Sequence, residues 1–201
     1  ILHLCIMITV SQLFIYPIKS LGGIELTSVE VGDRGFKNDR RWMLVDENNQ
    51  FMTQRDTHEM ALLKTSFNKD SLQVTFRSNV SENILIPLTI TNRKRITVRI
   101  WDDTCDAIEP GDFFNEWFSD ILKKTCKLVY MPDDSLRKVD GNYAANEEIT
   151  SFSDGYPILL IGQASLDELN SRLKDPVPIN RFRPNMVFTG SSAFEEDEFE
   201  Q

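Results

Sequence analysis

The sequence has few of the residues that build metal clusters and disulfide frameworks. Among its 201 residues are 3 cysteines and 2 histidines, and Cys5, Cys105 and Cys126 lie far apart along the chain. No CxxC pair or cysteine–histidine cluster is present, which argues against a structural zinc site. An odd number of cysteines in a chain of this length argues against a disulfide framework and suits a reducing compartment, so we expect a cytoplasmic protein.

Positive charge and long apolar runs are also scarce. The chain has 22 lysines and arginines against 31 aspartates and glutamates, which gives a net charge of −9. Because non-specific nucleic-acid binding needs a basic surface, we expect no nucleic-acid partner. Residues 1–10 are apolar but too few to cross a bilayer, so we expect no membrane span.

The sequence does contain many short segments with the alternation of β-strands, separated by turn residues. Residues 41–45 are typical of them: Trp42 and Leu44 would share one face and Met43 and Val45 the other, so we expect burial on both faces. Further strands are expected at 13–15, 24–31, 51–53, 72–76, 84–88, 95–101, 126–131, 157–161 and 186–190, with turns at 32–35 and 46–49. Many short strands joined by turn residues indicate a β-barrel or sandwich.

Two helices interrupt the strands. Apolar residues recur at helical spacing over residues 113–122, after Asp112, which we expect to be the N-cap. Their aromatic side chains favour a core face over a stacking platform. Residues 165–168 have the pattern of a capping box that opens a helix through Leu173. The fold class is therefore mainly β with some α.

A cation and a hydroxyl, Lys19 and Ser20, stand side by side where the first expected strand ends. Pro17 restricts the backbone before them, and glycines at 22 and 23 allow a reversal after them. Lysine supplies a point charge and serine a hydrogen-bond donor, which together suit a phosphate oxygen. Residues 16–20 alone favour the simpler interpretation, a solvated turn between two strands.

Three further segments also place polar groups at the ends of expected strands. The four segments contain Lys19 and Ser20; Asp39, Arg40 and Arg41; Ser153, Asp154 and Gly155; and Arg181, Arg183 and Asn185. Three of the four supply a cation on a chain that is otherwise acidic, which favours a small anionic ligand over a polyanion. The alternative is four unrelated strand ends with ordinary surface charges, and composition and spacing leave the two interpretations open.

These motifs resemble a known family. Residues 16–20, 39–45 and 53–55 are similar to the N-terminal β-barrel of MOSC proteins, the molybdenum cofactor sulfurase C-terminal family, in particular its amidoxime-reducing members. Residues 153–154, 164–166 and 180–185 resemble the start of the MOSC domain proper. The resemblance runs from about residue 10 to the end. It implies an N-terminal β-barrel domain over 10–130 and the first part of a MOSC domain over 131–201.

The resemblance implies a cofactor and a set of residues that hold it. The cofactor is the molybdenum cofactor, molybdopterin. The implied cofactor-binding residues are Lys19, Ser20, Arg40, Ser153, Asp154, Gly155, Arg183 and Asn185. Gly155 departs from the family pattern, since the amidoxime reducers carry a hydroxyl residue there, and Arg41, Arg55 and Arg181 are weaker candidates. Arginine forks match phosphate oxygens, and asparagine offers a donor and an acceptor to a pterin edge.

The activity implied for the full-length protein is reduction of N-hydroxylated small molecules, with electrons from a partner protein of the ferredoxin, flavodoxin or cytochrome b5 type. Pyridoxal phosphate binding is a further family-level implication. The family's metal-ligating cysteine is expected beyond Gln201, so the resemblance implies no catalytic residue or metal ligand within residues 1–201. Two alternatives remain: a non-catalytic carrier of the cofactor or its sulfur, and a barrel that serves only as an interaction module.

Overall fold

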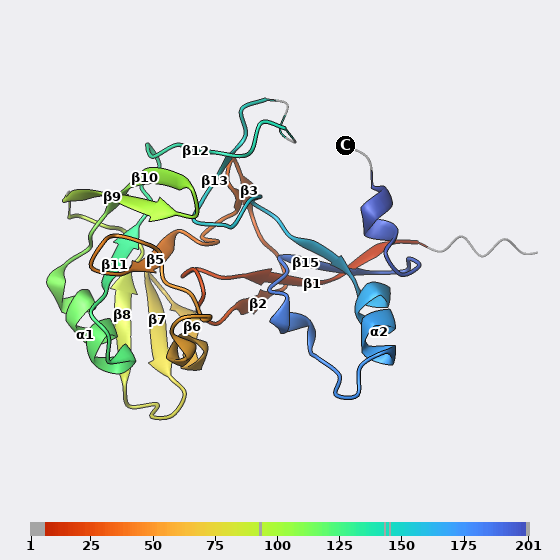
Figure 1. Cartoon of the computed structure of the whole chain (residues 1–201), viewed down its shortest axis with the longest axis horizontal. Coiled ribbons are helices and arrows are strands. Elements are labelled where there is room, and N and C mark those ends of the chain that lie inside the picture. The colour runs from red at the N-terminus through yellow and green to blue at the C-terminus, as the bar shows by residue number, and fades with distance from the viewer. Residues whose placement is uncertain (1–6, 93, 143, 145, 200–201) are drawn as a thin grey trace, which may run out of the picture.

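A computed structural model describes residues 7–92, 94–142, 144 and 146–199, and it is mainly β (Figure 1). The strands are β1 (Thr9–Ile15), β2 (Ile24–Leu26), β3 (Val31–Gly32), β4 (Gly35–Phe36), β5 (Trp42–Val45), β6 (Leu63–Asn68), β7 (Ser71–Phe76), β8 (Asn83–Pro87), β9 (Arg95–Ile100), β10 (Asp103–Ile108), β11 (Lys127–Tyr130), β12 (Arg137–Lys138), β13 (Ile149–Thr150), β14 (Leu160–Gly162) and β15 (Met186–Thr189). The α-helices are α1 (Asp112–Leu122) and α2 (Gln163–Ser171), and the 3₁₀ helices are η1 (His58–Leu62), η2 (Ile179–Arg181) and η3 (Glu195–Glu198). Within the described residues, no helix is long and apolar enough to cross a membrane.

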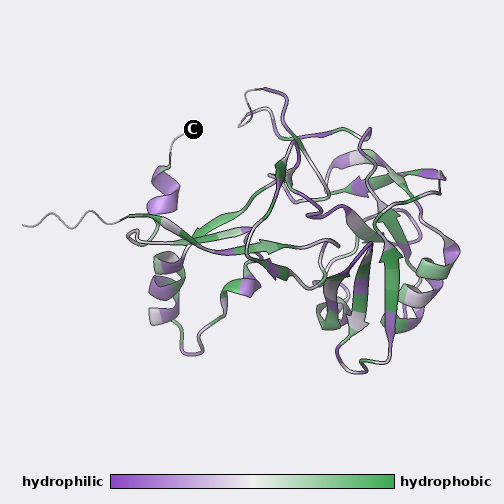
Figure 2. Ribbon diagram, turned by 180° about the vertical axis from the view of Figure 1, so that it is seen from behind, coloured by the Kyte–Doolittle hydropathy of each residue, from purple (hydrophilic) through white to green (hydrophobic). Residues whose placement is uncertain are grey.

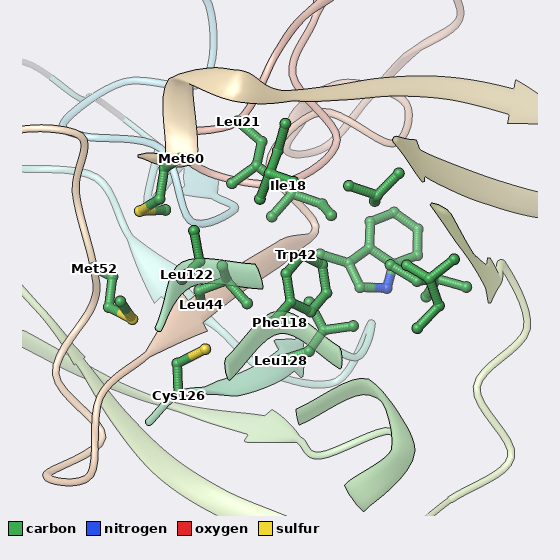
Figure 3. Close-up of a cluster of buried hydrophobic side chains, with 14 of the residues drawn as sticks. Ile18, Leu21, Trp42, Leu44, Met52, Met60, Phe118, Leu122, Cys126 and Leu128 are labelled. Carbon is green, nitrogen blue, oxygen red and sulfur yellow. The ribbon is translucent and has the colours of Figure 1, made fainter. Parts of the chain in front are cut away.

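The larger body of the molecule is built on a four-stranded sheet, in the order β5-β11-β10-β9, and a three-stranded sheet, β6-β7-β8. Between them lies a hydrophobic core that also receives the inner face of α1. Figure 3 shows Trp42 and Leu44 of β5 in this core together with Phe118 and Leu122 of α1. The apolar face of α1 is therefore a core face, except at Phe113, which is 67% exposed and does not reach the core.

The other face of β5 is buried in a second cluster. Met43 and Val45 pack there against residues of β9, β10 and β11, and both side chains are inaccessible to solvent. The expected burial of this strand on both faces is confirmed. The two α-helices differ from β5: Figure 2 shows hydrophilic and hydrophobic residues mixed along α1 and α2, because each helix packs against the protein with one face and exposes the other.

A second four-stranded sheet, in the order β14-β15-β1-β2, joins the two ends of the chain. In Figure 1 the red β1 runs beside the blue β15; the two are antiparallel, and Thr9 is opposite Thr189. β14 and β15 are parallel and are connected through α2. Strands from both sides of the expected boundary at 130/131 thus share one sheet, and that boundary stays a proposal.

The expected starts of both helices are wrong. α1 begins one residue earlier than expected, with Gly111 at the N-cap and Asp112 as its first residue. α2 begins at Gln163 instead of following a cap at Ser165, and it ends at Ser171 rather than Leu173. No capping box forms, because a carboxylate from η3 takes that place: Glu196 accepts hydrogen bonds from the Gly162 backbone N–H (2.9 Å) and from Ser165 Oγ (2.8 Å).

Several expected strands are shorter than predicted. The strand expected over 24–31 is interrupted: β2 covers only 24–26, and Val31 belongs to the separate short strand β3. The strand expected over 51–53 is reduced to a single bridge between Phe51 and Val45. The buried strand expected over 157–161 begins only at Leu160, and Leu159 just before it is 44% exposed. β6 and β10, both regular six-residue strands, were not predicted.

Candidate anion-binding site

The candidate site is built around Tyr16, which is buried at the end of β1. Two guanidinium groups stack on its ring: the guanidinium carbons of Arg40 and Arg183 lie 4.8 Å and 4.2 Å from the ring centroid. The Tyr16 backbone N–H donates to the Asp39 carboxylate (2.6 Å), and its carbonyl accepts from the Arg40 N–H (2.9 Å). The turn that follows β1 therefore holds the segments around residues 39–40 and 183 against each other.

Arg40 is fixed by protein groups on several sides. Its Nη1 donates to the buried Asp39 carboxylate and to Asn185 Oδ1 (3.1 Å), and its Nη2 donates to the Arg183 carbonyl (3.2 Å). The amide nitrogen of Asn185 is also hydrogen-bonded, since Nδ2 donates to the Phe14 carbonyl (3.2 Å). Asn185 is 1% exposed, so it orients Arg40 and ties it to β1 rather than facing open space.

Arg183 has one buried hydrogen-bond donor that no described protein atom accepts. Its Nη1 donates to the Leu21 carbonyl (2.6 Å), but its Nη2 is buried and has no hydrogen-bond partner in the described part of the chain. Burial, followed by the neighbouring charge of Arg40, lowers the pKa of Arg183 to about 10, so it remains protonated at neutral pH. A buried donor of this kind carries a desolvation cost unless an acceptor is supplied, and an anion would supply one.

Lys19 lies on the other side of the cluster and is 5% exposed. Its Nζ donates to the Phe152 carbonyl (2.8 Å) and to Asp154 Oδ1 (2.7 Å), and it sits 5.4 Å from the centre of the Phe51 ring. Burial lowers the pKa of Lys19 to about 8, against the opposing effect of Asp154. Lys19 and Asp154 therefore meet although 135 residues separate them.

The remaining predicted residues differ in their surroundings. Ser153 is 2% exposed, and its Oγ is a second buried polar atom that lacks a partner within the described residues. Ser20 offers its backbone carbonyl to Gln54 Nε2 at 2.5 Å. Gly155 is exposed, and a Cβ added there would meet nothing within 4 Å. Space therefore does not prevent a hydroxyl residue at 155.

Three residues of this cluster have a left-handed backbone conformation. Ser20, Arg40 and Arg183 all adopt left-handed conformations, with φ of 67°, 49° and 57°. Such conformations are uncommon outside glycine and asparagine and persist where the surroundings impose them, often at functional sites. Each of the three is a residue implied by the family resemblance.

The weaker candidates lie at different places. Arg41 is turned away from Tyr16; its Nη2 donates to Asp133 Oδ1 (2.6 Å), and its guanidinium stacks on Tyr130. Arg181 is exposed in η2. Arg55 is exposed and stacks on the ring of Trp101, with 5.7 Å between its guanidinium carbon and the ring centroid.

Arg137 is a residue of the site that sequence reasoning missed. It is 5% exposed, and its guanidinium donates to the carbonyls of Ser151 (3.1 Å), Ser153 (2.7 Å) and Asp154 (2.8 Å). It also forms an ion pair with Asp103 (2.8 Å). Arg137 thereby fixes the backbone of the loop that carries Ser153 and Asp154. The polar stretch around it has no periodicity that could have identified it.

The balance of charge in the cluster is positive. Lys19, Arg40 and Arg183 face two carboxylates, Asp39 and Asp154, which leaves one uncompensated positive charge. Where the structure describes the chain, no group of three histidine, cysteine or acidic residues could hold a metal ion. The arrangement suits a small anion held by fixed cations, and it offers buried donors from Arg183 and Ser153.

Two family models match the chain. The family described as the MOSC N-terminal beta barrel domain matches residues 7–125, and the MOSC domain matches residues 147–201. Mitochondrial amidoxime reducing component 2 of Rattus norvegicus is 32% identical over 205 residues, covering 96% of this chain and 60% of that protein. The Bos taurus protein of the same name is 29% identical over 206 residues, with coverage of 96% and 60%.

A second kind of relative matches a smaller share of its own length. Molybdenum cofactor sulfurase of Caenorhabditis elegans is 28% identical over 193 residues, which is 94% of this chain and 25% of that protein. The chain spans about 60% of the length of the amidoxime-reducing relatives. Those relatives are named as mitochondrial, and none of the three names mentions pyridoxal phosphate, so the cytoplasmic and pyridoxal phosphate expectations lack support.

Proposed function

Because this chain belongs to the MOSC family, we propose that it binds the molybdenum cofactor at the cluster around Tyr16. The observation that carries the proposal is the buried Nη2 of Arg183, which has no acceptor among the described protein atoms. Lys19 and Arg40 supply two further fixed charges, and Ser153 a buried hydroxyl. These groups fit the phosphate of a pterin cofactor, because guanidinium and ammonium groups bind phosphate oxygens through charge-assisted hydrogen bonds.

In the full-length protein we propose reduction of N-hydroxylated small molecules. The overall reaction would convert R–NHOH, two electrons and two protons into R–NH₂ and water, with the electrons supplied by a partner protein. The bound cofactor would supply the redox chemistry. This chain's residues would hold the cofactor in place, with the cations around Tyr16 setting the local charge.

The amidoxime-reducing relatives support this function. The likeness to a molybdenum cofactor sulfurase favours the second candidate, a non-catalytic carrier of the cofactor or its sulfur.

The test is to purify the full-length protein from a host that makes the cofactor, measure molybdenum and pterin, and assay an N-hydroxylated substrate with a chemical reductant. Bound molybdenum together with turnover of the N-hydroxylated substrate supports the reductase, and bound molybdenum without turnover supports the carrier. Protein that contains neither molybdenum nor pterin would refute both candidate functions.

Anion binding to this chain is expected to weaken as the pH rises past about 8. Below that pH the Lys19 side chain is protonated, and above it the charge is lost, because burial lowers the pKa of Lys19 to about 8. Sulfate is a suitable probe since its own charge is constant over this range. A charge-assisted bond contributes about 1.5–3 kcal/mol, so calorimetry should find sulfate binding roughly tenfold weaker at pH 9.5 than at pH 6.5.

The control for this experiment is Lys19→Met, which should bind sulfate weakly at both values and lose most of the pH dependence, because Arg183, with a pKa of about 10, stays mostly protonated at pH 9.5. Equal affinity of the unmodified chain at pH 6.5 and 9.5 would show that Lys19 does not contribute its charge to the site.

A further inference from the structure

Trp101 occupies an unusual position for a large aromatic residue. It is the first residue of the tight turn between β9 and β10, where Ile100 pairs with Asp103 and leaves a two-residue loop. Its φ is 53°, a left-handed conformation that glycine and asparagine adopt more easily in such turns. Its side chain is 43% exposed. A strained backbone and an exposed indole both cost stability, so the residue calls for a reason beyond packing.

The contacts of the Trp101 side chain supply that reason. Its Nε1 donates to Asp154 Oδ1 at 3.1 Å, and the same oxygen accepts from Lys19 Nζ at 2.7 Å. The Trp101 ring packs on the Phe51 ring, with 4.8 Å between the ring centroids. Lys19 Nζ lies over the same Phe51 ring, 5.4 Å from its centroid. The Asp154 side chain is 76% exposed, so without these two donors it would be free to turn into water.

We propose that Trp101 is a positioning residue for the anion site. Its indole N–H fixes the Asp154 carboxylate against Lys19 and so keeps the buried Lys19 side chain charged and aimed at the bound anion. The inference rests on the proposed function, since it concerns the same anion site. It adds a residue that touches neither the anion nor the cofactor and acts through Asp154.

The surrounding charges explain why the position of Asp154 matters. The charged groups that act on Lys19 are Asp154, Arg40 and Arg137, and Asp154 is the one that favours the protonated form. Arg40 is countered by Asp39, and Arg137 by Asp103. The negative charge of Asp154 also raises the pKa of Arg183, and so favours its protonated form. If Asp154 turned to solvent, Lys19 would stay buried among cations, and its protonated form would be disfavoured.

The experiment measures sulfate affinity against pH for the 201-residue chain and for Trp101→Phe, which keeps an aromatic ring and removes the N–H. We expect the pH at which sulfate affinity declines to move about one unit lower in Trp101→Phe. Affinity should be severalfold weaker near pH 8 and close to that of the unmodified chain at pH 6. Asp154→Asn should reproduce the shift.

Two further variants test whether the shift belongs to the Trp101 indole N–H in particular. Trp101→Asn suits the left-handed turn and cannot reach Asp154, so it should fold and show the same shift. Trp117→Phe makes the same chemical change on α1, where the indole packs on Phe118, and its pH profile should match that of the unmodified chain.

The outcomes separate this inference from the proposed site. If the unmodified chain binds sulfate with a decline near pH 8 and Trp101→Phe has the same profile, the role of Trp101 is refuted while the anion site stands. A uniform loss of affinity at every pH would indicate a merely structural role and would also refute it. No sulfate binding by the unmodified chain would overturn the anion site and this inference together.

Discussion

Substitution of Arg137 by methionine is expected to lower the free energy of unfolding by about 2–4 kcal/mol. Arg137 is 5% exposed and donates to the carbonyls of Ser151 and Ser153, residues that are themselves 1% and 2% exposed. Methionine fills a similar volume but provides no donor, so these carbonyls would be buried without partners. Asp103 would also lose its ion pair, although it is half exposed and can be solvated.

Urea unfolding followed by circular dichroism measures this loss. The matched control is Arg95→Met, since Arg95 forms a surface ion pair with Asp134 at 2.5 Å and the two side chains are 43% and 67% exposed. That variant should lose no more than about 1 kcal/mol. If the two variants lose the same small amount, Arg137 does not fix the loop that carries Ser153 and Asp154.

Replacement of Arg183 by alanine in the full-length protein is expected to reduce retained molybdenum roughly tenfold or more. The physical reason is that Arg183 offers a buried donor and a fixed charge, and a charge-assisted hydrogen bond contributes about 1.5–3 kcal/mol. Arg183→Lys should not restore full retention, because lysine lacks the planar fork and could not also bond the Leu21 carbonyl in the same geometry. Molybdenum per protein, measured on purified samples, gives the result.

Arg181→Ala is the matched control for this experiment. Arg181 is two residues away and exposed in η2, so its loss should leave the molybdenum content unchanged. The thermal midpoint of Arg183→Ala must also be close to that of the unmodified protein, so that the loss of molybdenum is not a consequence of unfolding. An Arg183→Ala protein with full molybdenum would refute the assignment of Arg183 to the cofactor.

The parts of the fold that sequence could predict are those set by local patterns. Period-two alternation placed β5 and its two buried faces, because Trp42 and Met43 are apolar neighbours that must point to opposite sides of one strand. The strand ends that carry Lys19, Arg40 and Arg183 could be found for the same reason. That these cations meet around the ring of Tyr16 is a property of the tertiary structure.

The wrong start of α2 and the failure to identify Arg137 and Trp101 share one cause, which is that distant partners replace local ones. The start of α2 could not be predicted because Glu196, 34 residues after Gly162, takes the capping role that a local box would fill. Arg137 and Trp101 were missed because their partners lie on other segments of the chain. Nothing next to either residue in sequence marks the loop at 151–154 as its target.

The pairing of β1 with β15 has a consequence for the order in which the chain can fold. The two strands are joined across 180 residues, so β1 leaves the ribosome long before its partner. At a synthesis rate of about 5–20 residues per second, that interval is roughly 10–40 s. β2 can cover one edge of β1 early, but the other edge stays open, and open strand edges invite pairing with other chains. During synthesis one edge of the first strand therefore stays unpaired until residues 186–189 have been made.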